Sequence, residues 1–465
     1  MIIRVIILWL FSFGLVFGQD SLNINSRSFS LDQFYEVVLG HPDMRLAEIA
    51  REQGALKLAG ARGNFDPTFK SDFRTKEFVG SDYFDVWNTE LTIPTPLSLD
   101  LKAGYERNQG IFLNPQNNVP GDGLYALGVS LPLGRGLLNN PRNLALKQAR
   151  IENRQGEVEA QDQRNNLFLK AAQVYWKWYE NHEKSRLIRE ALEVAQQRLE
   201  AVKMAVEQGD RAAIDSVEAE IQVQNWQNLR DQQSVALENT HLVLENYTWG
   251  TRLDWSTLHP VWQDKPDLLS LEHYHQYALS SNPQWQLLQL ESEIVAIEVV
   301  QAKEQLKPIL NLNYQLLLES TSGLSETGFY QNNYKGGIEF SMPLLLRKER
   351  AKLKGKRLKA EGIQLKQSQS IRRLLNDVEV AHNQILMWQQ LWIQQAQVVN
   401  NYQRLLDGER LKFFNGESSL FLINDRESKT LAAQLKQIEI LVAMELAFVQ
   451  LHWVSGLLPV DQQTL

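Results

Sequence analysis

The stretch RLKFFNGESSLFLINDRE, residues 410–427, has the pattern of two helices joined by a tight turn. Gly416 marks the reversal, because glycine permits the positive φ that is often needed just past the end of a helix. Ser419 can cap the following helix by accepting a hydrogen bond from a backbone amide in its first turn. A similar turn occurs at Gln208-Gly209-Asp210-Arg211, where Asp210 could act as the cap. The sequence therefore predicts two helical hairpins.

The helices that lead into these turns are unusually long. One is predicted from Pro141 to Gln208, with Asn140 as its cap and proline at the first helical position. The other is predicted from Arg347 to Phe414. Each has about 68 residues, which corresponds to roughly 100 Å at ~1.5 Å per residue. Apolar residues recur at helical spacing along the second long helix and its returning partner: Ile371, Leu374, Leu375, Val378, Ala381, Ile385, Trp388 and Trp392, then Leu431, Leu435, Ile438, Val442, Leu446, Val449 and Trp453. This length indicates a coiled-coil-like assembly.

The chain reads as two copies of one plan. Residues 61–67 correspond to residues 302–308 at a constant offset of 241. Other corresponding pairs are Ser30 with Ser270, Pro42 with Pro283, Pro132 with Pro343, Gly209 with Gly416, and Gly250 with Gly456. Each half is predicted as helix, strands, very long helix, tight turn and helix, which indicates duplication of one unit rather than a solenoid of short repeats. The predicted organisation is a signal peptide at 1–18, a first repeat at 19–250, a linker at 251–270 and a second repeat at 271–465.

Residues 1–18 have the layout of a cleavable secretory signal. Arg4 precedes an apolar core, Val5–Phe17, and the small residue Gly18 precedes polar Gln19. An apolar stretch of 13 residues is short for a membrane span of ~20, so we expect cleavage, with a single membrane anchor as the alternative. The chain has no cysteine, which excludes a lipid-anchored N-terminus, disulfides and thiolate metal sites.

Charge and motifs exclude several classes of function. Lys and Arg number 48 against 55 Asp and Glu, a net charge of −7, which argues against nucleic acid as a partner. No phosphate-binding loop, HExxH motif or nucleophile elbow occurs. His273 and His275 are two residues apart, so they point to different sides of a helix. We therefore predict no enzyme activity, no cofactor and no metal site. We also expect no transmembrane helix beyond the signal, so that only strands could enter a membrane.

Six short segments alternate between apolar and polar residues. They are residues 69–78, 87–93, 97–106, 125–131, 310–318 and 338–342. Alternation of this length fits strands with one face to lipid and one to a watery lumen, and it equally fits half of a soluble sandwich. Six strands are fewer than the eight of the smallest single-chain barrel, and an open sheet would leave its edges unpaired in lipid. In a membrane, several copies would therefore have to combine into one barrel.

A basic run, Arg347–Arg357, directly follows the last predicted strand. Such a run is usually a solvated helix face. Its position just below the predicted barrel also fits contact with anionic lipid headgroups.

The ordered set of features resembles the TolC-like outer-membrane efflux family over nearly all of the mature length: the duplicated layout, the paired Ala-Arg/Lys…Pro segments, the turn glycines and residues 410–427. The resemblance implies a mainly α homotrimer with an α-helical tunnel and a shared transmembrane β-barrel. The protein would be a passive exit duct in the outer membrane of a Gram-negative-type cell, surrounded by outer-membrane lipid and with a large periplasmic portion. It would dock to a periplasmic adaptor and an inner-membrane pump, in efflux or type I secretion. Pro67 to Pro132 spans 65 residues against 35 from Pro308 to Pro343, so twelve and eighteen strands per trimer both stay open.

The resemblance also implies roles for residues near the two turns. The predicted adaptor-binding tips are Gly209, Asp210, Arg211, Ala212, Gly416, Glu417, Ser418 and Ser419. Asp425 matches one of the acidic positions that ring the closed entrance in family members, although the companion position is Leu422. In the first half, Asp215 and Glu218 have the equivalent spacing. The alternative for these acids is a solvated helix face, and the alternative for the whole protein is a soluble periplasmic coiled-coil scaffold.

Overall fold

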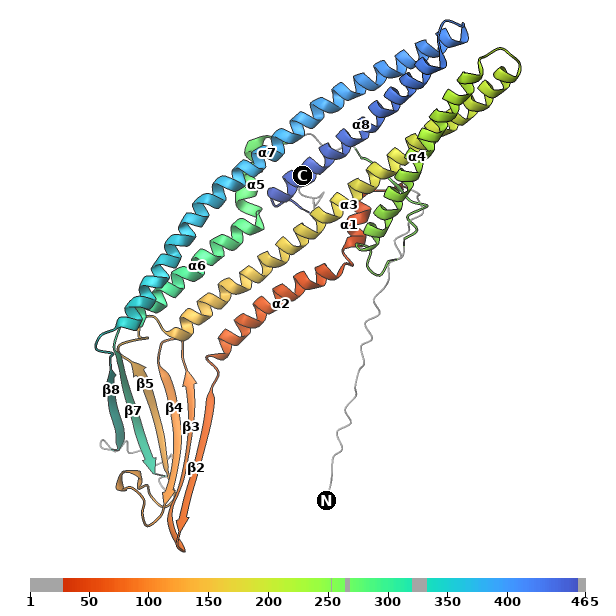
Figure 1. Ribbon diagram of the computed structural model, residues 1–465. Coiled ribbons are helices and arrows are strands. Elements are labelled where there is room, and N and C mark those ends of the chain that lie inside the picture. Colours follow the sequence, from red (N-terminus) through yellow and green to blue (C-terminus); the bar gives the residue numbers. More distant parts are fainter. Residues whose placement is uncertain (1–27, 252, 264–267, 320–332, 459–465) are drawn as a thin grey trace, which may run out of the picture.

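The computed structural model describes residues 28–251, 253–263, 268–319 and 333–458. The predicted signal peptide, residues 1–18, lies outside the described residues. The molecule is elongated, with an antiparallel sheet at one end and two helical hairpins reaching to the other (Figure 1). The prediction of a mainly helical chain with a barrel-like sheet is confirmed.

Eight helices are present in the described residues. In the first half they are α1 (Leu31–Val38), α2 (Pro42–Gly63), α3 (Pro141–Glu207) and α4 (Ala213–Glu245). In the second half they are α5 (Leu271–Ser281), α6 (Pro283–Glu304), α7 (Arg347–Phe414) and α8 (Leu420–Val454). The two long helices, α3 and α7, have 67 and 68 residues. Each reverses into a shorter partner and forms one hairpin.

Matching residues start the matching helices of the two halves. Pro42 and Pro283 occupy first-turn positions of α2 and α6, where the missing N–H of proline costs nothing. Asn140 caps α3 as expected, accepting a hydrogen bond from the Arg142 amide at 2.8 Å. The α2–α3 packing is close, because a side chain at Gly156 would meet the backbone of α2 near Ala50.

The sheet has six strands in the order β2-β3-β4-β5-β7-β8, with every neighbouring pair antiparallel. The strands are β2 (Thr68–Phe78), β3 (Ser81–Pro94), β4 (Asp100–Gln109), β5 (Leu124–Pro132), β7 (Ile309–Glu319) and β8 (Tyr334–Ser341). A short 3-10 helix, η1 (Pro115–Asn117), lies between β4 and β5. The first half therefore contributes four strands and the second half two.

Three predicted strand boundaries were wrong. Strand β3 starts at Ser81 rather than at residue 87, β8 covers Tyr334–Ser341 rather than 338–342, and the strand predicted at 97–106 starts later than expected. Residues 97–99 do not belong to β4, because they form the turn that joins β3 to β4. Ser98 has a φ of +65°, and its hydroxyl donates to the Leu137 carbonyl at 3.1 Å. The start of α3 holds the same turn, since Arg142 pairs with Asp100 at 2.6 Å and the Asn143 amide donates to the Pro96 carbonyl at 2.7 Å. These tertiary bonds override the alternating pattern.

The pairing register sorts the strand residues onto two different faces. One face is mainly apolar, with Asp85 and Arg107 as charged exceptions. The apolar residues that share it are Phe69, Phe73, Trp87, Leu91, Leu101, Ala103, Tyr105, Tyr125, Leu127, Val129, Leu312, Tyr314, Leu316, Tyr334, Ile338 and Phe340. The opposite face carries charged and amide groups, and two cross-strand ion pairs lie on it, Lys102–Glu90 and Lys335–Glu106, both at 3.2 Å. Leu317, opposite Ala126, is an apolar exception on the polar face.

The core lies where the helices overlap at mid-length. Phe29, Phe34, Tyr175, Trp176 and Trp178 are almost completely buried there. A second cluster joins α5, α7 and α8, and a third joins α3, α4 and the start of α8. The hairpins are therefore held together by apolar packing along most of their length.

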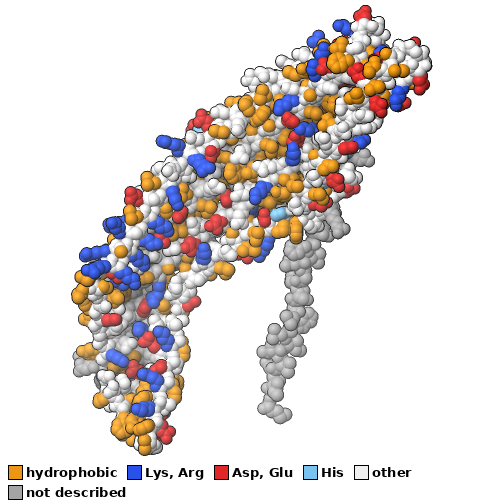
Figure 2. Space-filling model, in the orientation of Figure 1, with side chains coloured by type: hydrophobic (Ala, Val, Ile, Leu, Met, Phe, Trp, Pro, Cys, Tyr) orange, Lys and Arg blue, Asp and Glu red, His pale blue; other side chains and the backbone are white. Residues whose placement is uncertain are grey.

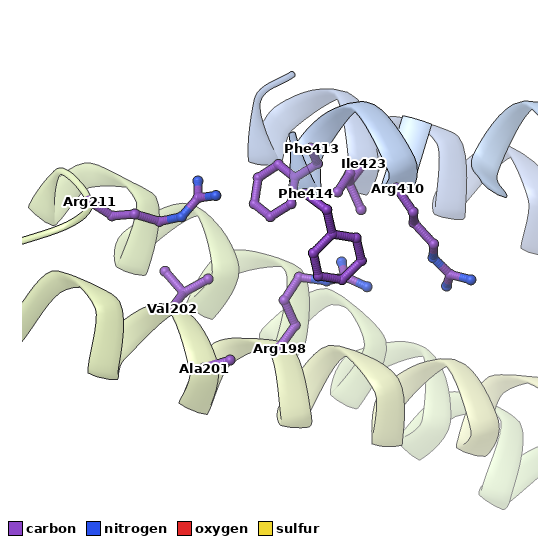
Figure 3. Close-up of a pocket in the computed structure, with 8 residues that line it drawn as sticks. All are labelled: Arg198, Ala201, Val202, Arg211, Arg410, Phe413, Phe414 and Ile423. Carbon is purple, nitrogen blue, oxygen red and sulfur yellow. The ribbon is translucent and has the colours of Figure 1, made fainter. Parts of the chain in front are cut away.

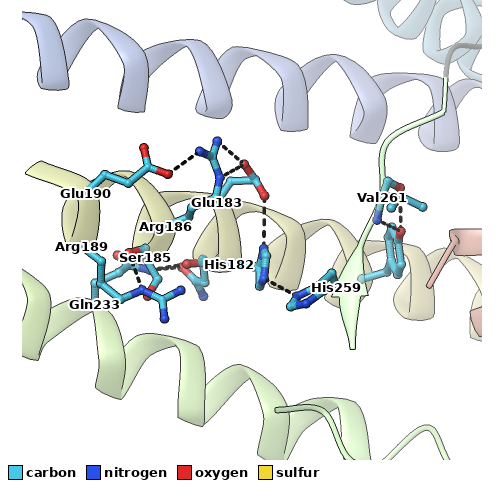
Figure 4. Close-up of polar contacts among 11 residues, drawn as sticks. His182, Glu183, Ser185, Arg186, Arg189, Glu190, Gln233, His259 and Val261 are labelled. Atoms are coloured by element: carbon cyan, nitrogen blue, oxygen red, sulfur yellow. Dashed lines mark hydrogen bonds and ion pairs between the residues drawn. The ribbon is translucent and has the colours of Figure 1, made fainter. Parts of the chain in front are cut away.

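A short parallel pairing crosses this core. Strand β1 (Ser28–Phe29) pairs with β6 (His259–Pro260). Beside them, the Tyr175 hydroxyl lies 2.8 Å from the carbonyl oxygens of Phe29 and Val261. On the same side of α3, the His182 ring lies 3.1 Å from the His259 ring and also contacts Glu183 (Figure 4). The segment between the halves is thus tied to the middle of α3.

The expectation that no later helix is apolar enough to cross a membrane was wrong for α8. By length and composition alone, this helix meets that requirement. However, 56% of its most apolar window is buried inside the protein. The composition of α8 is thus that of a core helix that packs against α3 and α7.

Candidate functional site

The two hairpin tips lie at the end of the molecule opposite the sheet (Figure 1). Each long helix ends in the same hydrogen-bonded motif. The Gly209 and Asp210 amides donate to the Val206 and Ala205 carbonyls, at 3.0 and 2.9 Å. This is a Schellman motif, and Gly209 adopts the φ of +81° that it requires.

The second tip repeats the motif. The Gly416 and Glu417 amides donate to the carbonyls of Phe413 and Lys412, at 3.1 and 2.8 Å, and the φ of Gly416 is +76°. Nothing lies within 4 Å of the position a side chain would take at either tip glycine. Both glycines are therefore required for backbone conformation, and the space around them is open.

The tips differ in how the returning helix starts. Ser419 caps α8 as predicted, with its hydroxyl accepting from the Leu422 amide at 3.4 Å. The prediction that Asp210 caps α4 was wrong, because the cap position is Ala212 and has no side-chain hydrogen bond. The first tip is thus held less firmly by its own side chains.

One carboxylate joins the two hairpins near the tips. Glu427 of α8 accepts a hydrogen bond from Arg410 of α7 at 3.0 Å and also pairs with Arg198 of α3. Arg198 in turn donates to the Asn424 side chain at 2.9 Å. The Glu427 side chain is only 10% exposed, so its two charge-assisted contacts are partly shielded from water and stronger than a surface pair.

The tips also touch through an aromatic contact. The Arg211 guanidinium lies 4.0 Å from the centre of the Phe413 ring, a cation–π arrangement. A cavity of about 240 Å³ lies between the hairpins at this point. Its lining residues are Arg198, Ala201, Val202, Arg211, Arg410, Phe413, Phe414 and Ile423 (Figure 3).

Two of the three gate candidates, Asp425 and Asp215, pair with nearby cations. Asp425 lies 2.9 Å from Lys429 and 3.3 Å from Arg426, on its own helix. Asp215 lies 3.5 Å from Arg211. Glu218 is half-buried on α4. A gating role for any of the three stays a prediction.

At the second tip, Ser418 has a partner of its own. Its hydroxyl donates to Glu409 at 2.5 Å. Arg426 lies 3.8 Å from the same carboxylate. The predicted tip residue Ser418 therefore closes the turn back onto α7.

A second link between the hairpins lies nearer the core. Lys184 of α3 pairs with Glu180 at 2.7 Å and with Glu439 of α8 at 2.8 Å. Burial favours the neutral form of Lys184, but its two carboxylate partners outweigh burial and raise its pKa. The hydrogen bond from Lys184 is the main cause that lowers the pKa of Glu439. Both hairpins thus stay joined by charge well away from the tips.

Sequence reasoning missed the residues that join the hairpins. Arg410 and Glu427 lie inside the stretch that indicated the second turn, but nothing in the pattern pairs them with Arg198. That pairing depends on how α3 lies against α8, which no local signal encodes. Within the described ranges, no group of three or more His, Asp or Glu could hold a metal ion.

The arrangement as a whole matches solved structures. No family model and no curated protein sequence matches this chain. The outer-membrane channel OprN is similar with a TM-score of 0.66 and 15% identity, over 92% of this chain and 89% of that one. The CmeC outer membrane channel of Campylobacter jejuni has a TM-score of 0.65 and 14% identity, over 92% and 85%. The outer membrane protein VceC of Vibrio cholerae has a TM-score of 0.65 and 13% identity, over 92% and 96%.

These similarities extend over nearly the whole of each chain. At such identities they establish a shared fold. The chain therefore has the fold of TolC-like outer-membrane channels, and the predicted resemblance is confirmed at that level.

Proposed function

We propose that this protein is the outer-membrane exit duct of a tripartite efflux or type I secretion system. Three copies form one tube, with a shared barrel in the membrane and a helical tunnel in the periplasm. The duct is passive, and its hairpin tips dock to a periplasmic adaptor that joins it to an inner-membrane pump.

The observation that carries this proposal is the open sheet. Among the described residues, β2 pairs only with β3 and β8 only with β7, so each end of the sheet has an unpaired edge. Phe69 and Phe73 on one edge strand are more than 60% exposed, as are Ile338 and Phe340 on the other. Exposed apolar edges of this kind lead to pairing with another chain.

Strand direction supports closure by identical copies. Because six strands alternate in direction, β8 runs opposite to β2. The β8 edge of one copy can therefore continue into the β2 edge of the next with antiparallel pairing preserved. Three copies would give eighteen strands, an even number as antiparallel outer-membrane barrels of this type have.

The two faces of the sheet fit the two environments of a barrel. The apolar face suits lipid and the polar face suits a water-filled lumen. Trp87, Tyr105 and Tyr125 form a contiguous aromatic row on the apolar face, with ring centres 6.0 and 4.9 Å apart. Such rows are typical of the membrane–water boundary.

The tips are the proposed adaptor contact. Gly209 and Gly416 reverse the chain with open space around them, and short exposed loops on a rigid scaffold frequently bind partners. The tip residues Asp210, Arg211, Ala212, Glu417, Ser418 and Ser419 complete this surface.

The first experiment measures membrane association and mass. The mature chain should stay with the outer membrane after carbonate washing, and in detergent it should have the mass of a trimer. In planar bilayers it should conduct ions. A monomer that is freely soluble without detergent would overturn the proposal and favour the soluble periplasmic scaffold.

A further inference from the structure

Four basic side chains lie on one face at the start of α7. Arg347, Arg350, Lys354 and Arg357 follow one another at spacings of three, four and three residues. Residues three and four apart on a helix point to the same side. The four cations therefore form one ridge along about three turns, which we call the α7 ridge.

The α7 ridge is exposed and has no ion-pair partner among the described residues. Its neighbours Lys356 and Lys359 differ, because they pair with Glu298 of α6 at 2.9 and 3.2 Å. These pairs lower the pKa of Glu298 despite the opposing effect of burial. The acid that follows the ridge on its own face is Glu361, one turn beyond Arg357. The cations near the start of α7 thus form two groups. Lys356 and Lys359 fasten α7 to α6, and the α7 ridge is exposed without an ion-pair partner among the described residues.

Exposed apolar side chains adjoin the ridge on the side of the sheet. Strand β8 ends at Ser341, and Leu344 and Leu345 follow with 97% and 63% of their surface exposed. Leu346 turns the chain into α7 with a φ of +49°. Figure 2 shows Lys and Arg side chains gathered where α7 meets the sheet, next to hydrophobic ones.

We propose that the α7 ridge binds the anionic headgroups of phospholipids in the leaflet that faces the helices, while Leu344 and Leu345 enter the acyl boundary beside them. This inference rests on the proposed membrane position of the sheet. Charge complementarity favours acidic lipid as the ligand, because a row of cations lies directly below an apolar barrel face. High salt should weaken this binding.

Closure of the barrel would add to this basic surface. The β2 edge is preceded by α2, whose last turns carry Lys57 and Arg62. Pairing of β8 with the β2 of a neighbouring copy would bring these two cations to the same level as the ridge. The seam between copies would then carry basic groups on both sides, with the exposed Asp66 as an acid at the same junction.

The test compares lipid preference in matched variants of the full-length protein. The ridge variant carries Arg347→Gln, Arg350→Gln, Lys354→Gln and Arg357→Gln. The control carries Lys366→Gln, Arg372→Gln, Arg373→Gln and Arg404→Gln, which removes the same charge from exposed positions farther along α7. The ratio of bound phosphatidylglycerol to phosphatidylcholine is measured by native mass spectrometry of protein from mixed micelles.

We expect wild type and the control to prefer phosphatidylglycerol, and the ridge variant to lose that preference by about tenfold. The preference of wild type should also weaken as salt is raised. Equal loss in the control would overturn the inference, since net charge alone would then explain binding. Retention in the ridge variant would overturn it as well.

Conductance in pure phosphatidylcholine bilayers separates this inference from the proposed function. Channels in neutral lipid without any preference for acidic lipid would overturn the ridge site and leave the duct intact. The reverse, a ridge-dependent lipid preference without conductance, would uphold the lipid site and contradict the duct.

Discussion

The two halves of this chain share one plan but differ at the sheet and at the helix ends. The first half contributes four strands to the six-stranded sheet and the second contributes two. Between α2 and α3 the extra hairpin β3–β4 is inserted, and its inner turn is fastened to the start of α3 by Arg142 and Asn143. The long helices, by contrast, have nearly the same length, although Asn140 caps α3 with its side chain and Leu346 gives α7 no side-chain cap. The two halves thus share their long helices and differ in the number of strands they contribute to the sheet.

A second difference concerns the junction of helix and sheet. Glu304, at the end of α6, corresponds to Gly63 at the end of α2. The buried Glu304 carboxylate accepts from the Gly136 amide at 2.9 Å and the Asn139 side chain at 3.1 Å, and it pairs with Lys307 at 2.8 Å. It therefore ties the second half to the first. At this junction, the halves therefore differ in a residue that forms contacts between them.

The largest expected effect is at the second tip. Gly416→Arg should abolish transport, because it places a bulky charge on the proposed docking surface, with a backbone cost of about 1–2 kcal/mol for the left-handed conformation. Trimers should remain intact in native electrophoresis, while cell-based efflux of a dye should show the loss of transport. Gly209→Arg is the matched change in the first half, and Gly416→Ala controls for the backbone cost. Normal transport in Gly416→Arg would refute the docking role of this tip.

The next effect tests the inserted hairpin. Deletion of residues 81–109 would make the first half resemble the second, with β2 taking the place of β4 beside β5. The barrel would then have twelve strands. Because barrel diameter grows roughly linearly with strand number, the cross-section and with it the single-channel conductance should fall to roughly half. An unchanged conductance in folded trimers would show that β3 and β4 do not belong to the barrel wall.

Loss of the Glu304 carboxylate, which joins the two halves, should have a smaller effect, on the stability of the folded protein. Burial works to raise the pKa of Glu304, but hydrogen bonds from Lys307, Gly136 and Asn139 outweigh it, so the pKa lies below its ordinary value of 4.5. Glu304→Gln should cost about 1–3 kcal/mol at neutral pH. A carboxyl group whose pKa is lowered by folding stabilises the protein when the pH is above the ordinary pKa. This contribution is lost as the pH falls through the lowered pKa. Thermal unfolding of wild type and variant should therefore converge in acid, and a constant difference would argue against a charged Glu304.

The smallest effect is expected at the gate candidates. Asp425→Ala should weaken cation block of single-channel current by about two- to fivefold, because Lys429 and Arg426 already offset part of its charge. Asp215→Ala provides the comparison in the first half. Unchanged block in Asp425→Ala would remove this residue from the gate.

Most of the fold could be predicted because its signals are local. Asn140 and Pro141 set the start of α3, Gly209 and Gly416 mark the reversals, and alternation marks the six strands. The exceptions are residues whose structure depends on contacts with residues far away in the sequence. Ser98 lies in the turn before β4 instead of in the predicted strand because it bonds to Leu137, and the bridge from Arg198 to Glu427 spans two hairpins. Such contacts depend on the relative placement of helices, which no short pattern records.

The parallel pairing of β1 with β6 has a consequence for how the chain is made. Ser28 pairs with His259, so the first residues of the described chain cannot form this pairing until the whole first hairpin has been synthesised. Contacts between residues so far apart form slowly, because a long loop must close first. Until then the contact between Phe29 and Trp178, both fully buried in the folded protein, cannot form.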